Sequence, residues 1–214
     1  TMNEGVCLVC DVDSERIAAR LRTKYLDEEA ANLDAAIERA VGAKEKDEAV
    51  SIGVRANATE LLRALLEKGI TPDCLTDQTS AHDPLRGYIP PGLTVEEANA
   101  LRESDPETYE QRSLDGMVAH VNAMVAMQDA GAVTFDYGNN LRQFAYDHGA
   151  ERAFDFWPAG SPGSLAVPFA ASKLVVADAF GPLCNAATRE ERAAASAGGG
   201  AGDAAGGLVD YYYA

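Results

Sequence analysis

Short apolar runs alternate along the chain with longer segments in which apolar residues recur every three or four positions. Such runs are typical of strands buried on both faces of a sheet, and the recurring pattern is typical of amphipathic helices. The helical patterns begin near residues 14, 27, 59, 94 and 141, and the apolar runs lie at residues 5–11, 49–54, 73–76 and 133–137. This regular alternation predicts a parallel sheet flanked by helices.

Capping residues mark several of the expected helix ends. Ser14 and Thr59 each stand before a helical pattern, where a hydroxyl can accept a hydrogen bond from the first turn. Thr94 and Glu97 have the spacing of a capping box. Gly131 stands just after the longest helical pattern, where a left-handed backbone ends a helix at little cost.

The pattern changes after Phe156. A loop-like stretch with Pro and Gly follows, and then an apolar run at residues 165–180 without a clear period. Residues 193–207 are almost wholly Ala and Gly, a composition that cannot supply a packed core. We therefore expect a globular domain over residues 1–156 and a low-complexity, disordered tail over residues 157–214.

The composition argues against several classes of protein. A net charge of -16 and a pI near 4.5 mean that a nucleic-acid backbone or an anionic membrane surface would repel the chain. No apolar run approaches the roughly 18 residues of a membrane span, and the first residues lack the pattern of a signal peptide. The four cysteines lack the spacing of a disulfide framework, which indicates a reducing compartment. We expect a cytoplasmic protein that binds neither nucleic acid nor membranes.

Polar residues recur directly after the expected strands, at Asp11, Asn57, residues 77–82 and residues 136–140. Because ligands of open parallel sheets bind at the carboxyl ends of the strands, we expect one shared site there. Asp11 stands where a dinucleotide-binding fold places its ribose-binding acid, and an ordinary strand-end carboxylate or helix cap is the alternative. Arg16, one helical turn later, is either a phosphate contact or a solvated arginine.

Residues 77–88 crowd carboxylates, a histidine, hydroxyls, an amide and a tyrosine into one stretch. A metal site is disfavoured, because the adjacent side chains of His82 and Asp83 seldom reach the same ion. A triad of Ser80 with these two residues is disfavoured as well, because neighbours in sequence cannot form the relayed geometry. Polar loop contacts to a bound ligand suit the spacing better.

Two long motifs carry a resemblance to a known family: residues 76–85 (TDQTSAHDPL) with Gly87 and Tyr88, and residues 135–140 (FDYGNN). Further matching stretches lie at residues 16–27, 117–124 and 153–156. In these motifs the chain resembles urocanase (urocanate hydratase), over roughly residues 1–156. The resemblance implies a Rossmann-like, NAD-binding domain that is inserted into a larger substrate-binding core.

Carried over by position, the resemblance implies a set of NAD contacts. Asp11 and Arg16 would hold the adenosine side of the cofactor, with aspartate in place of the glutamate that the family usually has. Asn57 and Ala58 would lie against the cofactor. The remaining implied contacts are Gln78, Thr79, Ser80, Ala81, His82, Tyr88, Ile89 and Tyr137. No catalytic residue and no metal ligand is assigned to this chain.

The chain also departs from the family pattern. Arg86 stands in place of an asparagine, and Arg55 with Ala56 replaces a smaller pair beside a backbone that should approach the cofactor closely. The family's first strand and glycine-rich phosphate loop belong before Thr1, so we expect a sheet without its first strand, with two open edges and marginal folding or oligomerisation. The family pattern stops after Phe156, as after a frameshift or altered splicing.

The implied activity is the addition of water to urocanate, which gives imidazolonepropionate in histidine breakdown. NAD+ serves there as an electrophile toward the substrate. The implied complete enzyme is a homodimer, and this chain alone is expected to be inactive. The alternative is a non-enzymatic, truncated interaction module that pairs with full-length subunits. A generic nucleotide-binding or metal-dependent enzyme is a third, weaker hypothesis.

Overall fold

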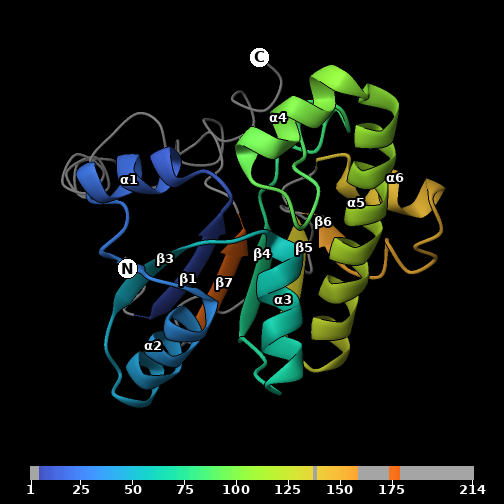
Figure 1. Ribbon diagram of the computed structural model, residues 1–214. Coiled ribbons are helices and arrows are strands. Elements are labelled where there is room, and N and C mark those ends of the chain that lie inside the picture. Colours follow the sequence, from blue (N-terminus) through green and yellow to red (C-terminus); the bar gives the residue numbers. More distant parts are fainter. Residues whose placement is uncertain (1–4, 137–138, 159–173, 179–214) are drawn as a thin grey trace, which may run out of the picture.

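The computed structural model describes residues 5–136, 139–158 and 174–178. Over these residues, seven strands form one sheet in the order β2-β3-β1-β7-β4-β5-β6, and all neighbouring strands are parallel (Figure 1). The strands are β1 (Val6–Asp11), β2 (Glu28–Ala30), β3 (Val50–Arg55), β4 (Cys74–Asp77), β5 (Val133–Asp136), β6 (Trp157–Pro158) and β7 (Leu174–Asp178). The predicted Rossmann-like parallel sheet is confirmed.

Helices cover this sheet. They are α1 (Ser14–Arg22), α2 (Leu33–Glu45), α3 (Ala58–Glu67), α4 (Val95–Ser104), α5 (Pro106–Asp129) and α6 (Leu141–Asp147). α2, α3 and α5 lie side by side over one face of the sheet (Figure 1). The core forms between their apolar faces and the strands, and includes Ile37, Leu61, Leu65, Met117 and Met124 with Leu8, Ile52, Val54, Leu75 and Val176. None of the helices in the described part of the chain is both long and apolar enough to cross a bilayer.

The caps of α1 and α3 are amide and carboxylate side chains that stand just before the hydroxyls we expected. Asp13 precedes Ser14 and accepts a hydrogen bond from the amide of residue 15 at 2.9 Å. Asn57 accepts from the amide of Thr59 at 3.0 Å, and Glu60 completes a capping box by accepting from the amide of Asn57. As N-caps, Asp and Asn are about as favourable as Ser and more favourable than Thr. The earlier residue of each pair therefore serves as the cap.

The expected long helix from residue 94 consists of two helices. Thr94 and Glu97 form the predicted capping box of α4. α4 ends at Ser104, the side chain of the next residue, Asp105, caps α5, and α5 begins with Pro106. A proline disfavours helical backbone at the residue before it and suits the first position of a new helix. Gly131 follows α5 with φ of +108°, as its position predicted.

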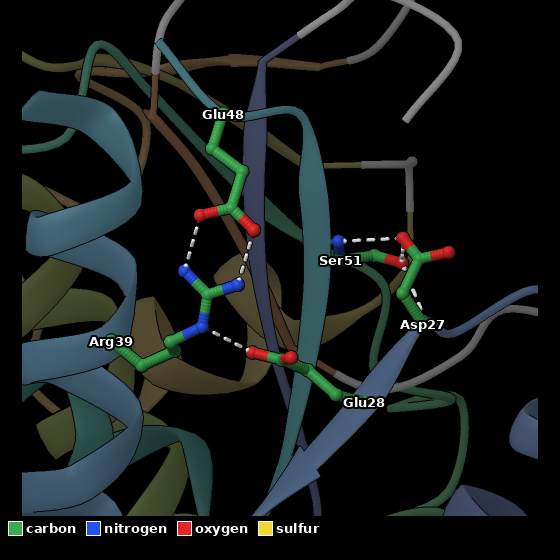
Figure 2. A network of polar contacts seen from close by, with 5 residues as sticks. All are labelled: Asp27, Glu28, Arg39, Glu48 and Ser51. Carbon is green, nitrogen blue, oxygen red and sulfur yellow. Dashed lines mark hydrogen bonds and ion pairs between the residues drawn. The ribbon is translucent and has the colours of Figure 1, made fainter. Parts of the chain in front are cut away.

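The segment after Asp27 forms an edge strand, where the sequence pattern had suggested a helix. The Asp27 carboxylate accepts from both the amide and the hydroxyl of Ser51 in β3, at 2.9 and 2.6 Å (Figure 2). These bonds hold the segment extended beside β3. Asn32 then caps α2, so the helix begins at Leu33.

Arg39 of α2 anchors that edge. Its Nη1 and Nη2 donate to the two carboxylate oxygens of Glu48 at 2.9 and 2.6 Å. Its Nε lies 2.6 Å from a carboxylate oxygen of Glu28 in β2 (Figure 2). One guanidinium therefore joins the edge strand, the helix that follows it and the turn that leads into β3.

β7 lies between β1 and β4, where we expected a gap. It pairs in parallel with residues 6–10 of β1 and with residues 74–76 of β4. The expectation of two open edges is therefore wrong, because a segment beyond residue 156 pairs with both strands. The domain division at residue 156 stays a prediction. The expectation of a disordered tail falls mostly on residues outside the described ranges.

Candidate functional site

A cavity of about 190 Å³ lies at the carboxyl end of the sheet. Its walls come from the ends of β1 and β3, the first residues of α1, α3 and α4, and the loop after β4. The lining residues are Cys10, Asp11, Val12, Asp13, Arg16, Ala56, Asn57, Ala58, Thr79, Ser80, Arg86, Gly87, Tyr88, Ile89 and Val95. A cavity therefore lies at the edge of the sheet where we expect a shared site.

One wall carries the strand-end carboxylate. Asp11 is 4% exposed, and its Oδ1 accepts from the amide of Asp13 at 2.9 Å, which fixes the side chain at the start of α1. Arg16 Nη1 lies 4.0 Å from Asp11 Oδ2, and Arg16 Nε lies 3.7 Å from an oxygen of Asp13. The Arg16 side chain is 59% exposed, so it can turn toward a ligand. This wall therefore offers both an acceptor and a cationic donor.

Asn57 joins two walls of the cavity. Its Oδ1 caps α3, and its Nδ2 donates to the carbonyl oxygen of Ile89 at 3.0 Å. The carboxamide is therefore engaged at both ends in holding the loop after β4 against the start of α3. Ala58, the first residue of α3, also lines the cavity.

The loop after β4 is held by a buried carboxylate. Asp77, which is 1% exposed, accepts from the amide of Thr79 at 2.9 Å. Asn139 donates from its Nδ2 to the other oxygen of Asp77 and to the carbonyl oxygen of Thr79. Two of the polar segments that we expected to share a site are therefore bonded to each other. Their carboxylate and carboxamide organise the loop, and neither lines the cavity.

Gly87 allows the same loop to fold back on itself. A Cβ atom at this position would lie 2.0 Å from the carbonyl oxygen of Ser80 and 3.0 Å from that of Asp83. The amide of Gly87 donates to the Asp83 carbonyl at 2.7 Å. A side chain there would push apart backbone atoms that shape the cavity wall.

Tyr88 is packed under the cavity from the helix side. It is 4% exposed, and its carbonyl oxygen accepts from the hydroxyl of the fully buried Tyr109 at 2.6 Å. Arg102 donates to the same hydroxyl at 2.6 Å. Gly116 makes room for this packing, because a Cβ there would lie 2.9 Å from the Tyr88 ring and 2.6 Å from Pro91. α4 and α5 thereby set the position of the loop.

The cavity gathers most, but not all, of the residues that the sequence suggested. Those that line it are Asp11, Arg16, Asn57, Ala58, Thr79, Ser80, Tyr88 and Ile89. Gln78, Ala81 and His82 are not among its lining residues; Ala81 is buried in the core, and His82 is exposed. Tyr137 lies outside the described residues.

Some residues that line the cavity are not among the contacts that the sequence predicts. Arg86 and Ala56 line the cavity although they depart from the family pattern, and Val12, Asp13, Gly87 and Val95 line it without being predicted contacts. Val95 is the first residue of α4, so the capping box at Thr94 was the signal that could have located it. The others follow a strand end or stand in the loop after β4.

Other chemistry-bearing residues are packed in the interior. Cys10 and Cys74 are buried and Cys7 is partly buried, and each of the three is a thiol, not half of a disulfide. Burial raises the pKa of the Cys74 thiol to about 12, so it stays protonated at neutral pH. His120 is buried in α5, with its ring centroid 6.4 Å from that of Tyr88. Across the described ranges, no three His, Cys, Asp or Glu side chains gather as a metal-binding group.

The arrangement is suited to binding. A nearly buried carboxylate can accept from ligand hydroxyls, Arg16 and Arg86 can contact an anion, and Val12, Ile89 and Val95 supply apolar surface. The volume is below the roughly 300 Å³ at which ligand pockets begin, so the cavity could enclose only part of a large ligand. The residues present therefore fit the nucleoside end of a dinucleotide cofactor.

A comparison with protein families agrees with this picture. A family model described as the urocanase Rossmann-like domain matches residues 1–159. The match spans more than half of the chain and contains all of the cavity-lining residues. β7 lies beyond its last residue.

Proposed function

The chain belongs to the urocanase family, and on that premise we propose that the cavity binds the adenosine half of NAD+ as part of a urocanate hydratase. The observation that carries the proposal is the position of Asp11. It ends β1 as a nearly buried carboxylate and opens onto the cavity beside Arg16. An acid at this place in a dinucleotide-binding sheet accepts hydrogen bonds from ribose hydroxyls.

The other lining residues receive roles that follow from their chemistry. Arg16 and Arg86, both exposed, would contact phosphate oxygens of the cofactor. The apolar surface of Val12, Ile89 and Val95 would face the adenine ring. Asn57 would act by position, because its side chain already holds α3 and the loop together.

The proposed contacts outside the cavity belong to the rest of the cofactor. Gln78 and His82 stand in the same loop as Thr79 and Ser80, and Tyr137 follows β5. Ala81 is fully buried, so its proposed contact requires the loop after β4 to shift when the cofactor binds. We keep these residues as proposed NAD contacts beyond the adenosine half.

In the proposed reaction, bound NAD+ supplies an electrophile for the hydration of urocanate. The residues of this chain bind and orient the cofactor, and none of them is proposed to react. A cytoplasmic homodimer that takes NAD and urocanate and binds neither nucleic acid nor membranes is the assembly we propose. The charge of -16 supports the last part, because it opposes binding to phosphate-rich polymers.

Calorimetric titration of the full 214-residue chain tests the proposal. We expect saturable binding of NAD+ and of ADP-ribose, and much weaker binding of nicotinamide mononucleotide, which lacks the adenosine half. Adenosine monophosphate should compete with NAD+. Equal affinity for nicotinamide mononucleotide and ADP-ribose, or no binding of either NAD+ or ADP-ribose at millimolar concentration, would contradict it.

A further inference from the structure

Hydrogen bonding between the two halves of the described sheet passes through β7. One half is β2-β3-β1, the other is β4-β5-β6, and β7 pairs with the inner strand of each. β7 comes after the residues that the family model matches. The strand that joins the halves therefore comes from outside the residues that the family model matches. We call the position between β1 and β4 the strand slot.

A side chain at the entrance of the strand slot fixes the register of β7. The amide of Leu174 donates to Asp73 Oδ2 at 2.7 Å, and the amide of Asp73 donates to the carbonyl oxygen of Leu174 at 3.0 Å. Lys44 of α2 donates from its Nζ to the same Asp73 oxygen at 3.1 Å. Because Asp73 directly precedes β4, this contact places the first residue of β7 against the start of β4.

Apolar rows within the strand slot favour one pattern of side chains. Val176 stands in register between Leu8 and Leu75, and Leu174 stands opposite Val6. Leu174 and Val176 are 2% and 1% exposed. A charge at either place would be buried without a partner. Sheets recognise extended peptides in this way. Hydrogen bonds to the peptide backbone provide affinity, and pockets for every second side chain provide specificity.

Filling the strand slot also joins the walls of the cavity. Asp11 ends β1, whereas Thr79 and Ser80 follow β4, and β7 is the strand between β1 and β4. The spacing of these two strands at the carboxyl edge depends on β7, because neighbouring strands lie about 4.8 Å apart.

We propose that the strand slot is a binding site for an extended, parallel peptide, and that residues 174–178 of this chain are its resident ligand. The contacts that select the strand are local to these five residues and their neighbours in β1 and β4. A separate peptide with the sequence of residues 172–180 (SKLVVADAF) therefore binds the same slot when the resident strand is defective.

Thiol trapping in the folded, full-length chain tests whether residues 174–178 occupy the strand slot. Val175 stands in register between Cys7 and Cys74, and Val176 stands between Leu8 and Leu75. In a Cys184→Ser background, Val175→Cys should form a disulfide within one chain when treated with oxidised glutathione. Cys7 is the expected partner, because burial holds the pKa of Cys74 at about 12. Val176→Cys is the matched control and should not cross-link above background.

Peptide rescue tests the slot as a binding site. The full chain with Val176→Asp should lose its cooperative melt or melt at a lower temperature, since the new carboxylate enters an apolar row. The peptide of residues 172–180 should restore the melt. The same peptide with Val176→Asp should bind at least about tenfold more weakly.

The results of the two tests together decide the proposal. A disulfide within one chain of the Val175→Cys variant, together with rescue by the unaltered peptide only, supports the proposal. A Val176→Asp chain that melts like the parent, or Val175→Cys cross-linking no better than its control, overturns it. Oxidation of a mixture of isotope-labelled and unlabelled Val175→Cys chains shows whether the disulfide forms within one chain. Disulfides mainly between labelled and unlabelled chains would mean that the slot is filled by a second chain, which overturns residues 174–178 of the same chain as its occupant. If the disulfide forms within one chain but the peptide does not restore the melt, the claim that the strand slot binds a separate peptide is overturned. None of these measurements needs NAD, so failure of the proposed function leaves them interpretable.

Discussion

Asp11 is held in place before any ligand arrives, because its Oδ1 already accepts from the amide of Asp13. Its other oxygen faces Arg16 at the edge of the cavity. Asp11→Asn keeps the first contact and removes the charge. We expect NAD+ to bind about 10- to 100-fold more weakly, since hydrogen bonds to a charged group contribute about 1.5–3 kcal/mol.

Titration calorimetry with the Asp11→Asn chain measures this change, and the melting temperature checks its fold. Asp47→Asn is a suitable control, because Asp47 is exposed in the turn before β3, at the opposite end of that strand from the cavity. Asparagine also accepts the positive φ of 52° at that position. Unchanged affinity in Asp11→Asn would remove Asp11 from the binding site.

Gly87 and Gly42 should respond in opposite directions to replacement by alanine. At Gly87 the new methyl group would meet the Ser80 carbonyl oxygen at 2.0 Å, so the loop must shift and the free energy of unfolding should fall by about 1–3 kcal/mol. At Gly42, inside α2, a Cβ meets nothing within 4 Å, so stability should rise by about 0.5–1 kcal/mol. Urea unfolding compares the two, and a Gly87→Ala chain as stable as the parent would contradict the crowding.

At the residue scale, the sequence predicted the place of the cavity better than it predicted which residues line it. Residues at strand ends and helix starts, such as Asp11 and Asn57, lie at the cavity because topology alone brings those positions together. Within the loop after β4, spacing could not tell which side chains face the cavity. His82 is exposed and Ala81 is buried, because the backbone folds back at Gly87.

At the scale of elements, the edge strand β2 depends on ionic contacts. The hydrogen bonds from Arg39 lower the pKa of Glu48 below its ordinary value of 4.5. A carboxylate with a lowered pKa stabilises the folded state above that ordinary value, and the contribution is lost as the pH falls through the folded pKa. Glu48→Gln should therefore lower the melting temperature slightly at pH 7, and the difference should vanish at pH values well below 4.5.

Melting curves of the parent and Glu48→Gln chains between about pH 3 and pH 7 provide the measurement. Glu29→Gln serves as the control, because Glu29 is exposed on the same edge strand. The effect is expected to be small, since both side chains are partly exposed to water, where screening weakens ion pairs. A difference that grows as the pH falls would contradict this origin.

Most elements followed from local signals, and the exceptions have physical causes. β2 spans only three residues and is held by contacts to Ser51 and Arg39, which no local pattern reveals. The split between α4 and α5 was visible in Asp105 and Pro106, although periodicity alone suggested one helix. β7 lies in an apolar run without a clear period, so no local alternation marks it as a strand.

For the whole molecule, ligand binding and docking of β7 should be linked. The walls of the proposed NAD+ site are joined by β7, so binding there should also stabilise β7. At a ligand concentration about one hundred times Kd, the free energy of unfolding should rise by about 2.7 kcal/mol. Hydrogen exchange should show slower exchange at the amides of β1, β4 and β7. Protection confined to the cavity-lining residues would contradict the linkage.

The place of β7 also determines the order in which the protein can complete itself during synthesis. β1, which contains Val6, is the first of the described strands to be made, and it pairs with β7, which is the last of them. Until then the two sheet halves each keep an unsatisfied inner strand, and such edges recruit other chains. Translation speed and chaperone supply should therefore influence the yield of soluble protein more strongly than for a sheet whose central strand is made first.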